Sequence, residues 1–287
     1  MRPSRRVMMK KLKQVLLIAR CGLHSTFTDT RMVIPLLLIG FIYDNGVRRF
    51  VESAKSVQAP VGMFEPFILC MNDWKYTVVF LLGFIFILSG IPRVNNEFYF
   101  FIHRADKLVW LFGELLNVIV SSFLYLSLLF LVCLAGGAVY SFPGNVWSRY
   151  VVDYELVYKA KASHNITIDD SVFRYELPFK TALNAFLLMF LCLVVLGSIV
   201  LLLSIFGKKI IGLLLCVLCI GFMVIFSGYR SWWMWFFPTS HGVISLHHIY
   251  IYKKEMVELS FSYIYLLTAE FVLTVMSCLA LKRKNYI

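Results

Sequence analysis

Residues 181–206 read TALNAFLLMFLCLVVLGSIVLLLSIF and contain no charged side chain. The hydrocarbon core of a bilayer is about 30 Å thick, and a helix of roughly 20 apolar residues crosses it. This stretch therefore predicts a membrane-spanning helix. The whole chain has the same character, because 60% of its 287 residues are hydrophobic, only 15% are charged and the mean hydropathy is +0.78. Soluble domains contain about a quarter charged residues, so we expect a single all-α integral membrane domain over 1–287.

Other apolar stretches bring the expected number of spans to six. The first of them is the least clear because it includes Asp29 and Arg31, which we place at the headgroup level. The third is longer than a bilayer requires, so we expect it to tilt or to project beyond the membrane. The expected spans are 26–43, 74–92, 108–140, 181–206, 210–229 and 259–281, and the expected outer loops are 44–73, 141–180 and 230–258.

The segment that precedes the first span, 8–23, is amphipathic. Its apolar residues recur at helical spacing and its lysines lie mainly away from them, which predicts a helix in the cytoplasmic interface. A disordered basic tail is the alternative interpretation. The apolar positions are Met9, Leu12, Leu16, Ala19 and Leu23.

Basic residues are distributed unevenly between the two sides of the expected bundle. With the N-terminus placed inside, the inner segments contain 16 of the 28 Lys and Arg residues against three acids, and the outer segments contain 12 against 11. Positive residues accumulate on the cytoplasmic side of membrane proteins. We therefore expect both termini in the cytoplasm, in a multi-pass protein of a bacterial cell membrane. The net charge of +12 is then a topology signal, and nucleic-acid binding is not expected.

No motif for nucleotide, metal or cofactor binding is complete. A P-loop requires GxxxxGK[ST], and Gly207-Lys208 lacks both the upstream Gly and the hydroxyl residue. Cys216 and Cys219 lie within an apolar stretch and are interpreted as small packing residues. We therefore expect no catalytic residue, no metal and no cofactor in this chain.

One short string has an enzyme-like composition. Residues 238–242 read PTSHG and resemble the P-S-G-H motif of type 2 phosphatidic-acid phosphatases, with Gly and His transposed. The cations that would hold a phosphate are missing, and they supply most of the electrostatic stabilisation in such a site. A lipid-phosphate phosphatase-like enzyme using His241 is therefore the lesser alternative. His247 and His248 are interpreted as interfacial, since no acid or Cys cluster joins them.

Three polar residues within the expected spans are candidates for a translocation path or gate. Glu270 lies midway along the sixth span, where an ionised carboxylate is costly and functional roles are common. The alternative is a neutral Glu that hydrogen-bonds across a helix interface. Asn117 and Asn184 are expected to form hydrogen bonds between helices, and Glu114 is expected to reach the cytoplasmic headgroups.

The inner connection between spans two and three is the last candidate. Residues 93–108 read RVNNEFYFFIHRADKL. A short helix with aromatic residues on one side and charges on the other suits docking into a groove on a partner. An ordinary amphipathic connector is the alternative.

The order of these features resembles the membrane subunits of ABC exporters of the type-2 permease family. Those subunits have an interfacial elbow helix, six spans, cytoplasmic termini and a coupling helix between spans two and three, for which 8–23 and 94–106 are the counterparts here. Glu97, His103-Arg104 and Gly113-Glu114-Leu115 are similar to the Glu, the Arg-rich turn and the Gly-Lys-Leu of many members. Glu114 stands where Lys is common, and the loop 141–180 is longer than expected, so the subfamily and substrate are not defined.

The resemblance implies a function for the chain as one part of a larger transporter. A separate ABC ATPase subunit would bind ATP and Mg and receive the coupling helix, and a second permease, identical or related, would complete the path. The substrate would be hydrophobic or amphiphilic, such as a peptide, lipid or drug. A sensor, assembly factor or immunity protein without a motor is the main alternative. The implied coupling residues are Glu97, Phe98, Phe101 and Arg104.

Overall fold

The computed structural model describes residues 5–92, 106–174, 176–229, 231–249, 254–255 and 257–283. The protein is 80% helical, which confirms the all-α class. Five helical segments in the described part are long and apolar enough to cross a membrane, and a bent pair of helices raises the number to six. Four of the five are single helices close to the expected spans, namely α7 (Lys107–Ala138), α10 (Pro178–Ile205), α11 (Lys209–Gly228) and α13 (Leu259–Arg283).

The first candidate span, Thr30–Ser56, is much longer than expected. Arg48 lies one helical turn from both Asp44 and Glu52, and its guanidinium donates to each carboxylate at 2.9 Å. Such i,i+4 pairs stabilise a helix by a few tenths of a kcal/mol, so these charges belong to a helix and not to a loop. The expected end of the span at 43, and the outer loop starting at 44, were wrong. Its parts are η1 (Thr30–Met32), α2 (Val33–Ile42), η2 (Tyr43–Arg48, a π-helix) and α3 (Arg49–Ser56).

The second span is the bent pair. Helices α4 (Glu65–Asn72) and α5 (Trp74–Ser89) meet at 79°. Asp73 forms the break, because its backbone is extended and its carboxylate accepts a hydrogen bond from the Lys75 amide at 2.9 Å as the N-cap of α5. Helix α5 begins at Trp74, the residue at which the span was expected to start, whereas α4 lies in a stretch that was expected to be a loop.

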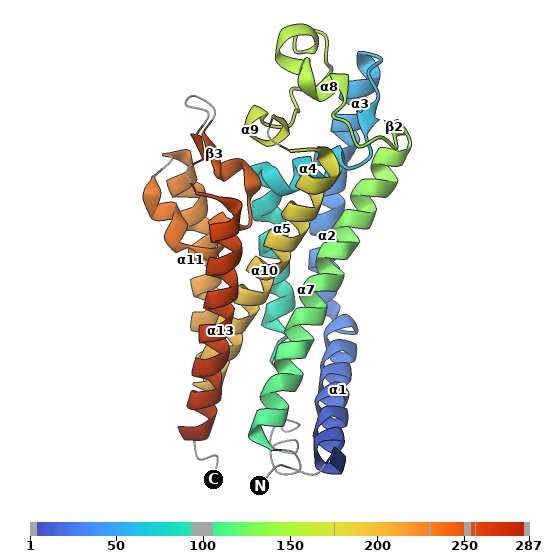
Figure 1. Ribbon diagram of the computed structural model, residues 1–287. Helices are drawn as coiled ribbons and strands as arrows, with labels where there is room; N and C mark the ends of the chain where they lie inside the picture. Colours follow the sequence, from blue (N-terminus) through green and yellow to red (C-terminus); the bar gives the residue numbers. More distant parts are fainter. Residues whose placement is uncertain are drawn as a thin grey trace.

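The long helices form one bundle whose two ends differ (Figure 1). The start of α1 (Arg5–Phe27) and the end of α13 lie at the same end, called here the terminal end. The helix predicted at 8–23 is thus present, but it runs along the first half of α7 with the bundle axis, a packing that the amphipathic pattern did not predict. A Cβ atom on Gly113 would lie 2.6 Å from the Ile18 Cγ2 atom, so this close approach requires glycine.

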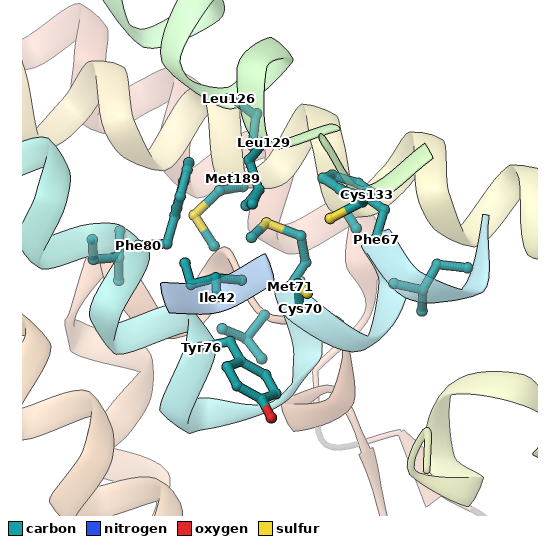
Figure 2. Close-up of a cluster of buried hydrophobic side chains, with 14 of the residues drawn as sticks. Ile42, Phe67, Cys70, Met71, Tyr76, Phe80, Leu126, Leu129, Cys133 and Met189 are labelled. Carbon is teal, nitrogen blue, oxygen red and sulfur yellow. The ribbon is translucent and has the colours of Figure 1, made fainter. Parts of the chain in front are cut away.

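The largest buried cluster lies where α4, α5, α7 and α10 meet (Figure 2). Tyr125 stacks on Phe80 with ring centroids 4.5 Å apart, and its hydroxyl donates to the Phe80 carbonyl at 3.1 Å. Cys70 and Cys133 are fully buried in the same cluster, and no disulfide links any of the seven cysteines. The cluster therefore fixes the bent pair against α7 by packing and by the hydrogen bond from Tyr125, without a disulfide.

The opposite end, called the loop end, is covered by folded polar segments (Figure 1). Residues 141–180 form a cap, joined to the rest of the chain by a parallel pair in which Val61 lies opposite Ser141. Residues 231–249 fold back over the ends of α11 and α13. The elements at this end are β1 (Val61–Gly62), β2 (Ser141–Phe142), α8 (Arg149–Val152), η3 (Tyr154–Tyr158), α9 (Asp170–Phe173), η4 (Trp232–Phe236), α12 (Pro238–His241), η5 (Ile244–Leu246), β3 (His248–Ile249) and β4 (Lys254–Glu255).

Large apolar side chains are exposed along the outer faces of the spans. Ile210 on α11 is 82% exposed and Phe271 on α13 is 69% exposed. A water-soluble protein would bury such residues, whereas lipid tails provide an equally apolar environment. This surface supports the assignment as a multi-pass protein of a lipid bilayer.

Candidate functional site

Glu65 joins the cap to the bundle. It is the first residue of α4 and is fully buried. Its Oε2 atom accepts hydrogen bonds from the Gly62 amide at 2.8 Å and the Ser148 hydroxyl at 2.7 Å, and its Oε1 atom accepts one from the Ser148 amide at 2.6 Å. A buried carboxylate is tolerated only when hydrogen bonds replace its hydration. This one is satisfied at both oxygens and holds Ser148 in place from 83 residues away.

A buried tyrosine fixes the cap to the first span. The Tyr150 hydroxyl lies 2.8 Å from the Ser53 hydroxyl on α3 and donates to the Ile166 carbonyl at 2.9 Å. Burial raises the pKa of Tyr150 to about 12, so the hydroxyl keeps its proton at neutral pH and remains a donor. Tyr150 therefore joins the cap to α3 through a buried hydrogen bond.

A cavity of about 1140 Å³ lies beneath this cap. Its walls come from the cap, the bend between α4 and α5, the last turns of α11 and the folded segment 231–249. A cavity of this size accommodates a drug-sized molecule or a short peptide segment. Its apolar lining includes Leu69, Trp74, Val151, Met223, Val224, Met234 and Leu246.

Among the described residues, the charged lining of the cavity consists of four acids and one base, Lys75. Asp73 and Asp169 are both helix N-caps, and Asp169 accepts a hydrogen bond from the Ser171 amide at 2.8 Å. The other two acids are paired within their own helices, Asp170 with Arg174 and Glu155 with Lys159, each at 2.7 Å. The combination of apolar walls with carboxylates suits an amphiphile whose polar group is cationic or donates hydrogen bonds.

Glu270 lies in α13 and faces α10. Its Oε1 atom accepts hydrogen bonds from the Ser198 hydroxyl at 2.8 Å and from the Thr274 hydroxyl at 3.3 Å. Its Oε2 atom is buried and has no hydrogen-bond partner among the described residues. The interhelical hydrogen bond that the sequence analysis offered as the alternative is present, and it uses only one of the two oxygens.

The other two path candidates lie elsewhere in the bundle. Asn184 accepts a hydrogen bond from the Tyr263 hydroxyl at 3.1 Å and donates to Glu176 at 2.9 Å, near the loop end. It therefore links α10 to α13, as expected of an interhelical hydrogen-bonding residue.

Asn117 lies in the half of α7 that contacts α1. Its amide faces Gly22, whose hypothetical Cβ atom would lie 2.5 Å from the Asn117 Nδ2 atom. It also donates to Glu114 at 3.5 Å, and both side chains are buried. Glu114 thus faces the interior of the structure. Asn117, Asn184 and Glu270 each have separate partners, and the structure does not bring the three together.

His241 is fully buried and both of its ring nitrogens are engaged. The Nδ1 atom lies 2.8 Å from the Ser262 hydroxyl oxygen and the Nε2 atom lies 2.9 Å from the Trp235 carbonyl oxygen. Burial lowers the pKa of His241 to about 4, and the hydrogen bond to the Trp235 carbonyl opposes this shift. The geometry is that of a packed structural histidine, with neither nitrogen exposed for attack on a substrate.

The expected coupling residues Glu97, Phe98, Phe101 and Arg104 lie outside the described residues. The structure does describe both flanks of their segment. The Lys209 ammonium donates to the Pro92 carbonyl at 3.1 Å, and the Lys11 ammonium forms an ion pair with Asp106 at 2.9 Å.

No family model matches the sequence, and no curated protein or solved structure is significantly similar to it. The comparisons therefore assign no family, and functional inference depends on the architecture and on the sites themselves.

Sequence reasoning missed the cavity and its carboxylates. Asp73, Glu155, Asp169 and Asp170 are spread over three segments that meet only in the folded protein. The one local signal was the pattern of Asp73 followed by the apolar stretch of α5, which is typical of an N-cap. That pattern locates a helix start and says nothing about a cavity.

Proposed function

We propose that this chain is the permease subunit of an ATP-driven ABC exporter of the type-2 kind. In this proposal a separate ATPase subunit binds ATP and Mg, and a second permease, identical or related, completes the path. The cavity at the loop end contacts a hydrophobic or amphiphilic substrate as it passes, and its carboxylates favour one that carries a cationic group.

The observation that carries the proposal is that the expected coupling segment and the cavity are associated with opposite ends of the bundle. The flanks of 93–105 are bonded to Lys11 near the start of α1 and to Lys209 at the start of α11. The cap lies at the loop end (Figure 1). The cavity beneath it is lined by the start of α5 and the last turns of α11, which are the ends of these helices away from 93–105. A motor docked on 93–105 and a substrate in the cavity would thus act on opposite ends of the same helices.

The packing also supports transmission along these helices. α5 and α7 are the two helices that flank 93–105, and the stacked pair of Phe80 and Tyr125 joins them in the core. Displacement of packed helices as rigid bodies is an established means of switching between two arrangements. A push on 93–105 would therefore reach the bend at Asp73, which lines the cavity.

The proposal is tested by reversing charges in the expected coupling segment. We expect Glu97→Lys and Arg104→Glu to leave the assembled transporter intact and to reduce substrate-stimulated ATP hydrolysis at least fivefold. Glu258→Lys is the matched control, because Glu258 is exposed and lies at the loop end. Unchanged stimulation in both coupling variants would remove the coupling assignment.

A sensor, assembly factor or immunity protein without a motor is the second candidate, favoured by one observation. The cap is held by buried hydrogen bonds at Glu65 and Tyr150 above a large cavity, an arrangement that suits recognition of a molecule without transport. This candidate predicts that no ATPase accompanies the chain. We propose no catalytic role for His241, because both of its ring nitrogens are already bonded.

A further inference from the structure

Two histidines and a serine form a buried polar cluster at the loop end. His241 ends α12, His247 follows η5, and Ser262 lies in the first turn of α13. All three are fully buried. The cluster joins the folded segment 231–249 to a membrane-spanning helix and is separate from the proposed coupling segment.

The contacts within the cluster are short, and each of the four ring nitrogens lies within 2.9 Å of an oxygen atom. His241 Nδ1 lies 2.8 Å and His247 Nε2 lies 2.7 Å from the same atom, the Ser262 hydroxyl oxygen. The opposite nitrogens face backbone carbonyl oxygens, His241 Nε2 at 2.9 Å from Trp235 and His247 Nδ1 at 2.9 Å from Val243.

These contacts can be checked by counting hydrogen atoms. A carbonyl oxygen only accepts, so each nitrogen that faces a carbonyl must carry a hydrogen. A neutral imidazole has only one N–H. If both rings are neutral, His241 Nδ1 and His247 Nε2 are therefore both bare acceptors facing Ser262, whose hydroxyl has a single hydrogen. One of the two short contacts would then place two lone pairs against each other in a buried site.

One additional proton satisfies every contact. We propose that the His241–Ser262–His247 cluster is a proton-binding site that holds one proton in the folded protein, with the charge on His247. His247 then donates through Nε2 to the Ser262 oxygen, and the Ser262 hydroxyl donates to the bare Nδ1 of a neutral His241. All four contacts become hydrogen bonds, and no polar atom of the three side chains faces another of the same kind.

The surroundings favour this distribution of charge. His241 is the ring that burial keeps neutral, since its pKa is lowered to about 4. The Trp235 ring contacts His247 edge-on, with ring centroids 4.8 Å apart. The Val243 carbonyl oxygen at His247 Nδ1 is a dipole that favours a positive charge on this ring. The charge therefore belongs on His247.

The titratable groups on the neighbouring elements add no opposing positive charge among the described side chains. Tyr265 of α13 stacks on His241 with centroids 4.1 Å apart, Cys192 of α10 lies against Gly242, and Thr239 donates to the carbonyl of Cys219 on α11. None of these three side chains is charged at neutral pH. Glu258 precedes α13, is exposed and accepts a hydrogen bond from Ser260.

The site is placed to influence the cavity. Val243, Ser245 and Leu246 lie between the two histidines in sequence and line the cavity wall, as does Met234. Removal of the proton breaks one of the two bonds to Ser262 and loosens the attachment of this wall to α13. This inference is independent of whether the chain belongs to a transporter.

Nitrogen-15 NMR of the full-length protein labelled at histidine, in lipid nanodiscs at pH 8, tests the proposal. The chain has six histidines, and ordinary ones are neutral at this pH. We expect one equivalent of a ring with both nitrogens protonated, which disappears in His247→Gln and persists in the control His24→Gln, a variant of an exposed histidine. Absence of a doubly protonated ring in the wild-type protein would overturn the proposal.

A second set of variants assigns the NMR signal to the cluster even if His247→Gln fails to fold. Single Gln variants of the four histidines outside the cluster must all retain the signal, which then belongs to the cluster. Loss of the signal in any one of them would also overturn the proposal. These four residues are His24, His103, His164 and His248.

Discussion

Two carboxylates shielded from bulk water, Glu65 at the loop end and Glu270 in α13, differ in how completely they are bonded. Glu65 accepts three hydrogen bonds distributed over both oxygens. Glu270 accepts two, both at Oε1, and its buried Oε2 has no partner among the described residues. A buried group that is bonded at every polar atom stabilises one arrangement of its surroundings, whereas a buried oxygen without a protein partner can accept a further donor. The contrast separates a structural carboxylate from a candidate gate.

The largest expected effect is at the structural carboxylate. Glu65→Ala leaves the Gly62 amide and both Ser148 donors without an acceptor, and each buried unsatisfied donor costs about 1–3 kcal/mol. We expect the free energy of unfolding to fall by about 4 kcal/mol, measured by thermal unfolding in detergent. Glu52→Ala, at an exposed ion pair with Arg48, is the control and should change it by less than about 0.5 kcal/mol. Equal melting temperatures for the two variants would contradict the structural role of Glu65.

A pH titration extends the comparison to a buried base, His241, whose neutral form is favoured by burial. The pKa of His241 is about 4 in the folded protein and about 6.5 when unfolded, so between these values the unfolded chain binds more protons. The contribution of neutral His241 to the free energy of unfolding is fully present above about pH 6.5 and is lost as the pH falls toward 4. It amounts to about 3 kcal/mol.

Unfolding measured from pH 7 to pH 4 tests this expectation. The wild-type protein should lose stability over this range, and His241→Gln, which cannot titrate, should lose markedly less. If the two proteins lost stability in parallel, the acid sensitivity would not arise from His241.

A smaller effect is expected where the cap meets the first span. Tyr150→Phe removes the hydrogen bonds to Ser53 and Ile166, which should lower the free energy of unfolding by about 2 kcal/mol. Amide hydrogen exchange in 141–180 should accelerate in the same variant, because the cap loses its hydrogen bond to Ser53 on α3. Tyr158→Phe is the matched control, since the Tyr158 hydroxyl makes no hydrogen bond among the described residues. Equal exchange in both variants would show that the cap is held elsewhere.

The smallest effect on stability is expected at Glu270. In Glu270→Gln the side-chain carbonyl still accepts the bond from Ser198, so the free energy of unfolding should change by less than about 1 kcal/mol. Substrate transport or resistance should nevertheless fall if the second oxygen serves a gate. Ser198→Ala is the control for the interhelical bond alone. A variant that is stable and fully active would assign Glu270 to packing.

Hydropathy identified the spans well where apolar length alone decides them. The starts expected at 74, 108, 181, 210 and 259 lie within three residues of the observed helix starts. Each of these helices begins where a polar segment ends, and the bilayer requires the remainder to be apolar. The expected end of the first span was too early because Asp44, Arg48 and Glu52 were assigned to an outer loop. Their four-residue spacing allows ion pairs within a helix.

The candidate sites were less accessible to sequence reasoning. The sequence identified Glu270 because a carboxylate within an apolar stretch is conspicuous, but its partner Ser198 is 72 residues away. Glu65 also lies in an apolar stretch, but it fell within a segment expected to be a loop, and its acceptor role depends on Ser148, 83 residues away in the cap. The role of His241 was judged from a local motif, whereas its two partners, Ser262 and Trp235, are specified by the tertiary fold.

Affinity purification of the chain from its native membrane in mild detergent, with mass spectrometry of every co-eluting protein, tests the central claim most directly. The account predicts a stoichiometric partner that contains a P-loop, together with a second permease or evidence of two copies of this chain. Recovery of this chain alone, under conditions that preserve known transporter complexes, would contradict the proposal of an ATP-driven exporter.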